Sequence, residues 1–181
     1  VPSLATASYT SKSFSLASQG TYNYYAMTFN GDGTKAYFTG FGPDAILQYS
    51  LSTAWDISTA SYDSVSLDVS GQTDAGQSGL VFSPDGSKLY MVSYGTDTVY
   101  QYALTTPFDL STGSYASKSL SISSQDSNPQ DMYIKSDGTK LYVLGDTNNS
   151  VFQYSMSTPF DLATASYDSV SFVTTSQQTN P

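Results

Sequence analysis

Ser83-Pro84-Asp85-Gly86-Ser87, followed by Lys88-Leu89-Tyr90-Met91-Val92, has the pattern of a tight turn that runs into a β-strand. Proline fixes φ early in such a turn, and glycine accepts the positive φ that follows. An apolar run at residues 79–82 precedes the turn, and alternating residues at 99–104 follow the second strand. This part of the chain is therefore predicted to form antiparallel β-strands joined by short turns.

The same turn occurs three times, as Asp32-Gly33, Asp85-Gly86 and Asp137-Gly138, at steps of 53 and 52 residues. Other markers keep this spacing, which excludes coincidence. A period of about 50 residues filled with strands is typical of propellers and related arrays. The other markers are the pairs Gln48-Tyr49, Gln101-Tyr102 and Gln153-Tyr154, and the tyrosines Tyr9, Tyr62, Tyr115 and Tyr167.

Each repeat is predicted to fold as one four-stranded antiparallel blade, with apolar inner strands and a polar outer strand. The fold class is therefore all-β, a β-propeller-type array of three complete blades plus an extra outer strand. The inner strands are expected at 26–29, 79–82 and 131–134, and the second strands at 35–39, 88–93 and 140–144. The third strands are expected at 46–51, 99–104 and 151–156, and the outer strands at 11–16, 64–69, 115–122 and 169–173.

The expected units are the outer strand of a preceding blade at 1–20, blade 1 at 21–70, blade 2 at 71–123 and blade 3 at 124–174. Residues 175–181 are expected to start a further linker or repeat. Three blades are too few to close a ring, since propellers have about four to eight. We expect a window from a longer chain; assembly of copies into a ring or filament is the alternative.

The charged residues are unusual, because all 15 acids are Asp and all six bases are Lys. Glu and Arg favour helices, whereas Asp favours turns and caps, so their absence argues against helices. A net charge of −9 argues against nucleic acid as a partner. No apolar run is long enough to insert into a membrane. An acidic chain without Cys fits an extracellular, cell-surface or virion location.

Residues 83–92, together with Thr98-Val99-Tyr100-Gln101-Tyr102, resemble the repeat of the YVTN/lactonase-like and TolB-like β-propellers. The resemblance covers nearly the whole chain and implies the blade fold. It implies little about activity, because that superfamily includes enzymes, sugar-binding proteins and scaffolds. Repeats of similar sequence also resemble those of large bacterial surface proteins and phage structural proteins.

The recurring carboxylates are predicted to be structural. The Asp of each Asp-Gly pair is expected to cap backbone N–H groups in its turn. Asp56, Asp109 and Asp161 are expected to hold the long connection before each outer strand, with the preceding aromatic residue filling the gap between blades. No Asp-x-Asp-x-Asp-Gly segment is present, so we predict no metal or cofactor, with Ca²⁺ as a minor alternative.

Catalytic triads that use His or Cys are excluded, because the chain has neither residue. We predict no catalytic residues and no enzyme activity. The repeats differ mainly in the loops that should share one face of the propeller, and loops on a rigid scaffold are where binding evolves. Tyrosine rings, amides and carboxylates suit glycans or protein surfaces. The candidate ligand-binding residues are Tyr22, Asn23, Tyr24, Tyr25, Asp74, Gln77, Tyr94, Asp97, Asp126, Asn128, Asp146 and Asn148.

The leading functional prediction is a non-enzymatic extracellular structural or adhesion module within a larger surface, fibre or filament assembly. Its expected partners are other copies of itself or further blades, and also glycans or surface proteins. The second prediction is a glycan-binding propeller that uses the variable loops. A hydrolase of lactonase or glycosidase type is the third.

Overall fold

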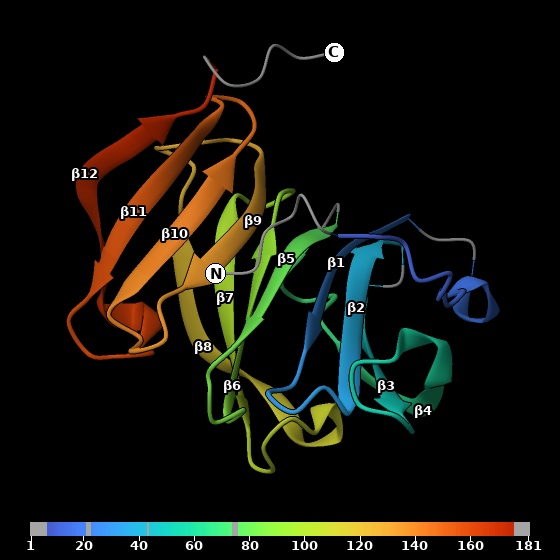
Figure 1. The fold of residues 1–181 in the computed structure, drawn as a ribbon. Helices are drawn as coiled ribbons and strands as arrows, with labels where there is room; N and C mark the ends of the chain where they lie inside the picture. The colour runs from blue at the N-terminus through green and yellow to red at the C-terminus, as the bar shows by residue number, and fades with distance from the viewer. Residues whose placement is uncertain (1–6, 21–22, 43, 74–75, 176–181) are drawn as a thin grey trace.

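The computed structural model describes residues 7–20, 23–42, 44–73 and 76–175, and this part of the chain is built from β-strands with a few 3₁₀ turns (Figure 1). Three antiparallel sheets of four strands follow one another along the chain, each in simple meander order. We refer to these sheets as blades 1, 2 and 3. The predicted fold class, with four strands per blade, is confirmed.

Blade 1 consists of β1 (Asn23–Phe29), β2 (Lys35–Phe41), β3 (Ala45–Leu51) and β4 (Ala60–Asp68). Blade 2 consists of β5 (Gln77–Phe82), β6 (Lys88–Ser93), β7 (Thr98–Leu104) and β8 (Gly113–Ser121). Blade 3 consists of β9 (Pro129–Ile134), β10 (Lys140–Gly145), β11 (Ser150–Met156) and β12 (Ala165–Val173). The inner strand β5 contacts both β1 and β9, and the blades fan out from these three strands (Figure 1).

The outer strands begin earlier than predicted, because each one contains a bulge. In blade 1 the ladder pairs Gln48 with Val65 and then Tyr49 with Tyr62, so Ser64 lies in the bulge with φ of 59°. Ser117 and Ser169 repeat this conformation in the other blades. The bulge interrupts the alternation of polar and apolar residues, which hid the first four residues of the outer strand in blades 1 and 3 and the first two in blade 2.

Residues 11–16 do not form the predicted extra strand. The segment 7–20 contains only the short 3₁₀ helix η2 (Ala17–Gln19), and no described strand pairs with it. Ser11 nevertheless has φ of 59°, the value of the bulge serines, and Phe14 packs edge-on against Tyr49 of blade 1 at 5.1 Å. The segment therefore has the bulge conformation of an outer strand without a ladder, since a strand needs a partner for its backbone groups.

Two of the three apolar clusters lie between blades, and the third lies on the outer face of blade 1, where Phe14 and Leu16 pack against it. Side chains of the middle strands alternate, so that one set faces the previous blade and the other faces the next. Tyr37 and Ile46 of blade 1 pack against Leu89, Met91 and Tyr102 of blade 2. A second cluster joins blades 2 and 3 in the same way. A single blade therefore cannot bury its own apolar faces and depends on its neighbours.

A buried tyrosine ties each blade to the next one. The Tyr37 hydroxyl donates to the backbone carbonyl of Phe108, and the Tyr90 hydroxyl donates to that of Phe160, each at 2.6 Å. Burial, reinforced by nearby aspartates, raises the pKa of both tyrosines well above the usual value. Both hydroxyls therefore remain protonated donors at any physiological pH.

A buried glutamine makes the second link across each junction. The N–H of Leu110 donates to Gln48 Oε1, and the N–H of Leu162 donates to Gln101 Oε1, each at 2.9 Å. The two junctions in the structure thus share one pair of hydrogen bonds, from equivalent residues at equivalent distances. This pair sets the register of one blade on the next.

The Asp-Gly turns are stabilised as predicted. Asp32, Asp85 and Asp137 each accept a hydrogen bond from the backbone N–H two residues later, at 2.9–3.0 Å. The glycine of each turn has φ between 70° and 73° and lies under the aromatic ring of the long connection in its own blade. In blade 1 this ring belongs to Trp55. The backbone N–H of Trp55 donates to the Gly33 carbonyl at 2.9 Å.

The long connections are held by Asp56, Asp109 and Asp161, as expected. Each is the N-cap of a one-turn 3₁₀ helix and accepts a hydrogen bond from the backbone N–H two residues later, at 3.0–3.2 Å. These helices are η3 (Ile57–Thr59), η4 (Leu110–Thr112) and η5 (Leu162–Thr164). The ring of Phe108 also packs against Phe82 at 5.2 Å, at the junction between blades 1 and 2.

Replacing Gly33 by alanine is expected to destabilise the protein by about 2 kcal/mol or more, because a Cβ at positive φ is strained and would overlap the Trp55 ring. The matched control is Gly31→Ala in the same turn, where nothing lies within 4 Å of the new methyl group. This control should change the free energy of unfolding by less than about 0.5 kcal/mol. Urea unfolding measures both values, and equal values for the two variants would contradict the packing described here.

Candidate functional site

The loops that precede the inner strands share one face of the molecule with the turns between the second and third strands. In blade 3 the N–H of Asp146 donates to the Asn128 carbonyl at 3.0 Å, and in blade 2 the hydroxyls of Thr73 and Ser93 lie 3.1 Å apart. We call this the loop face. The Asp-Gly turns and the long connections lie together on the opposite face, so the loops that differ between repeats share one face, as predicted.

A cavity of about 290 Å³ opens on the loop face where the three blades meet. It is lined by Tyr25 of β1, Tyr94 after β6, Asn128 in the loop before β9, and Gln130 of β9. The rings of Tyr25 and Tyr94 meet edge-on, with centroids 6.3 Å apart. Burial, and to a smaller extent Tyr25, raises the pKa of Tyr94, so its hydroxyl is protonated at neutral pH.

A second hollow of about 270 Å³ shares Tyr25 and Gln130 with the first and extends along the inner strands. Asp131 of β9 adds a carboxylate to its wall and accepts a hydrogen bond from the N–H of Met132 at 2.8 Å. Gly79 of β5 lies directly against this carboxylate, since a Cβ there would come within 3.0 Å of Asp131 Oδ1. The other residues that line this hollow are Ala26, Met27, Ser78 and Leu80.

The amide groups of the cavity are oriented by a short relay. Gln130 Nε2 donates to Asn128 Oδ1 at 2.8 Å, and Asn128 Nδ2 donates to Asp146 Oδ2 at 2.9 Å. This relay holds Gln130 and Asn128 in defined orientations on the cavity wall. A ligand at this place meets tyrosine rings, amides and one carboxylate, which is the chemistry that binds polyhydroxylated molecules.

Asp126 was predicted as a ligand-binding residue, but it is buried beneath the loop face and lines neither hollow. The residue is almost fully buried, and its carboxylate accepts hydrogen bonds from the N–H groups of Asn128, Thr147 and Asn148 at 2.8–3.4 Å. It therefore ties the loop before β9 to the turn after β10. Asn148 is part of the same structure, since its Nδ2 donates to the Gln125 carbonyl at 2.7 Å.

Two further candidates point away from the cavity. Gln77 is fully buried between blades 1 and 2, where Thr39 Oγ1 donates to its Oε1 at 2.7 Å. Tyr24 packs against the apolar cluster on the other side of blade 1, and the register shift between Tyr24 and Ala26 leaves Tyr25 in a bulge of β1. Tyr25, rather than Tyr24, therefore faces the cavity.

The structure thus brings Tyr25, Tyr94 and Asn128 together, with Asp146 behind them. Asn23 begins β1, and Asp97 follows Tyr94 in its turn; neither lines the cavity. Tyr22 and Asp74 lie outside the described residues. The sequence prediction missed Met27 and Asp131, because both were assigned only to inner strands. The sequence pattern of those strands allowed Met27 and Asp131 to be exposed, but whether they are exposed depends on how the blades fan out.

No group of three or more acidic side chains close enough to hold a metal ion is found in the described ranges. The predictions about metals and cofactors therefore remain predictions. In the same part of the chain, no helix has the length and apolar character needed to cross a bilayer.

Comparison with known proteins was informative only at the level of structure. Neither a family model nor a curated protein sequence matches this chain. A protein from Lactobacillus plantarum superposes with a TM-score of 0.60 and 18% identity, over 84% of this chain and 42% of its own. This chain spans about two fifths of the length of this neighbour. The fold is that of a β-propeller.

Two other neighbours carry activity names. One, from Bacteroides fragilis, is provisionally assigned as a 6-phosphogluconolactonase; its TM-score is 0.59 at 17% identity, over 81% of this chain and 38% of its own. The other is the periplasmic gluconolactonase of Pseudomonas aeruginosa; its TM-score is 0.56 at 16% identity, over 78% of this chain and 36% of its own. Identities this low relate the folds alone.

These neighbours overturn the leading functional prediction, a non-enzymatic structural or adhesion module. Proteins named for enzymatic action on sugar lactones have the same blade array. A hydrolase was only the third prediction, because His and Cys are absent and no pair of aspartates stood out from the repeat. Carboxylates and tyrosines can also transfer protons.

Asp126→Ala is expected to lower the free energy of unfolding by about 2–3 kcal/mol, because it leaves buried N–H groups without their charged acceptor. Amide hydrogen exchange should also become faster at Asn128 and Asn148. Asp146→Ala is the control, since it removes one exposed hydrogen bond and should cost less than about 1 kcal/mol. Equal losses in the two variants would show that Asp126 does not hold the loop face together.

Proposed function

We propose that the cavity on the loop face binds a sugar lactone and that the protein hydrolyses it, as a propeller-type lactonase. The observation that carries this proposal is that Asp131, Tyr25 and Gln130 line one solvent-open hollow. Neighbours of the same fold that are named as lactonases support the reaction class. Because the chain spans about two fifths of those neighbours, the three blades are proposed to supply one side of the substrate site.

The lining favours an uncharged lactone over a phosphorylated one. Tyr25 and Tyr94 present aromatic faces on which a sugar ring can stack, and Asn128 and Gln130 can exchange hydrogen bonds with its hydroxyls. None of the residues that line the two hollows is a lysine, and the chain carries a net charge of −9. A phosphate group would find no cation there, so its charge would be repelled.

In the proposed reaction, Asp131 acts as the general base. Its carboxylate takes a proton from a water molecule while the water oxygen attacks the lactone carbonyl carbon. The Tyr25 hydroxyl donates a hydrogen bond to the carbonyl oxygen in this proposal, as negative charge develops on it. The bond between the carbonyl carbon and the ring oxygen then breaks. The ring oxygen recovers the proton from Asp131, which yields the open-chain hydroxy acid.

The test is hydrolysis of glucono-δ-lactone, followed by acid release and corrected for the spontaneous rate. Asp131→Asn should lower kcat/KM by about a hundredfold, since general-base catalysis contributes roughly 10²–10⁴-fold. Tyr25→Phe should lower it about tenfold or more, because one donor to the developing oxyanion is lost. Adding a phosphate to the substrate should weaken turnover.

The matched control is Asp44→Asn, which removes the same charge in the turn between β2 and β3 at a residue that lines neither hollow. Asp44 has φ of 43°, a conformation that asparagine accepts readily. This variant should keep the wild-type rate. Binding of the lactone without hydrolysis above the spontaneous rate would refute the proposal, and so would equal rates for Asp131→Asn and Asp44→Asn.

A further inference from the structure

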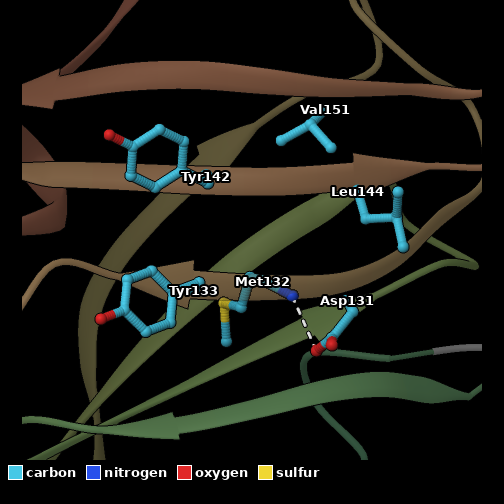
Figure 2. Close-up of a pocket in the computed structure, with 6 residues that line it drawn as sticks. All are labelled: Asp131, Met132, Tyr133, Tyr142, Leu144 and Val151. Carbon is cyan, nitrogen blue, oxygen red and sulfur yellow. Dashed lines mark hydrogen bonds between the residues drawn. The ribbon is translucent and has the colours of Figure 1, made fainter. Parts of the chain in front are cut away.

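The face of blade 3 that points away from blade 2 is an open blade-binding surface. It exposes Tyr133 (59% exposed), Leu144 (40%) and Phe172 (61%). Figure 2 shows Tyr133, Tyr142, Leu144 and Val151 on this face, around a hollow of about 200 Å³. At the position equivalent to Leu144, blade 2 has Val92, which is fully buried by the next blade. The exposed apolar face therefore matches a surface that is covered elsewhere in the same molecule.

This face also carries the hydrogen-bonding groups that link blades. Tyr142 is the third member of the series that begins with Tyr37 and Tyr90, and Gln153 is the third member after Gln48 and Gln101. Gln153 Nε2 donates to Asp168 Oδ2 at 2.7 Å, which directs Oε1 to the other side of the amide. In blade 1 the same arrangement is in use: Gln48 Nε2 donates to an aspartate at 2.8 Å, and Gln48 Oε1 accepts from the next blade.

The complementary groups lie at the other end of the chain, on blade 1. Trp55 and Ile57 occupy the positions of Phe108 and Leu110, whose carbonyl and N–H group receive the links from the preceding blade. The Trp55 side chain is 61% exposed. One end of the described chain thus offers a tyrosine hydroxyl and a glutamine oxygen, and the other end offers the carbonyl and the N–H group that would pair with them.

We propose that the open face of blade 3 binds the Trp55 side of blade 1 in a second copy of this chain. The Tyr142 hydroxyl donates to the Trp55 carbonyl of the other copy, and the N–H of Ile57 donates to Gln153 Oε1. Two copies joined in this way at both ends close a six-bladed ring, within the range of about four to eight blades found in propellers. The proposed interface would repeat the tyrosine and glutamine hydrogen bonds of the two junctions within the chain.

The segment 7–20 must move aside for this docking, because it covers part of the same side of blade 1. It is held there by an ion pair between Lys12 and Asp56 and by the packing of Phe14 on Tyr49, without a strand ladder. In blade 2, Lys118 of β8 pairs with Asp161 of the next blade at 2.8 Å, so the segment occupies the position of an outer strand. β12 of the second copy takes over this position.

Sedimentation velocity of the purified chain over a wide range of concentrations tests the proposal. The expected result is a monomer that converts to a single species of two chains. Phe172→Asp and Leu144→Asp should abolish this species, because each places a charge on the open apolar face. Ser119→Asp is the control: it adds the same charge at an exposed position of β8 in blade 2 and should leave association unchanged.

Tyr142→Phe provides a test that does not depend on a disruptive change. It removes only the hydroxyl and should raise the dissociation constant about fivefold, the effect of one hydrogen bond. Tyr115→Phe on β8 should have no effect. Circular dichroism establishes whether each variant is folded. If an Asp variant does not fold, the dissociation constants of Tyr142→Phe and Tyr115→Phe test the proposal instead.

A wild-type chain that stays monomeric would overturn the proposal, as would an open-ended series of larger species or dimers that persist in Phe172→Asp and Tyr142→Phe. Asp131 lines both this hollow and the proposed lactone site. None of these variants changes Asp131 and lactone hydrolysis is not measured, so the failure of one proposal can be told from the failure of the other.

Discussion

The structure depends on the packing of one sheet against the next. Each four-stranded blade has two apolar faces and no interior of its own, so its core forms only when a neighbour covers it. The hydrogen bonds made by Tyr37 and Gln48, repeated by Tyr90 and Gln101, add direction to this apolar contact. Apolar burial alone would allow the sheets to slide. Two buried polar groups with defined partners fix one register, because leaving either group unpaired would be costly.

The same constraint explains where the candidate site lies. The face with the Asp-Gly turns and long connections is occupied by the caps and aromatic rings that shape each blade, so its sequence recurs from blade to blade. The loop face makes fewer of these contacts, and its residues differ between the repeats. Asp126 replaces the hydroxyl-based contacts of Thr73 and Ser93, for example, and supports a loop of different shape. The blades thus hold side chains that differ between the repeats around the cavity where the three blades meet.

The open face of blade 3 is a consequence of the same repetition. The face of blade 3 that no described blade covers presents the chemistry of the internal junctions. Tyr142 and Gln153 keep the identities of their counterparts although no described blade packs on them. Asp168 pairs with Gln153 as Asp63 pairs with Gln48, so the orientation of the amide is set inside blade 3. The surface is organised before any partner arrives.

The sequence by itself determined the period, the four strands of each blade, the Asp-Gly turns and the caps of the long connections, because these depend on contacts between residues close in the chain. It also indicated the loop face and placed Tyr25, Tyr94 and Asn128 among the candidates, which the structure brings together around one cavity. Only the tertiary structure decided that Gln77 and Asp126 are buried, that Tyr24 faces away from the cavity, and that Asp131 lies in its wall. These outcomes depend on how far neighbouring sheets splay and on which side of a bulge a residue falls. Both are set by packing between residues about 50 positions apart in the chain, which local patterns do not record.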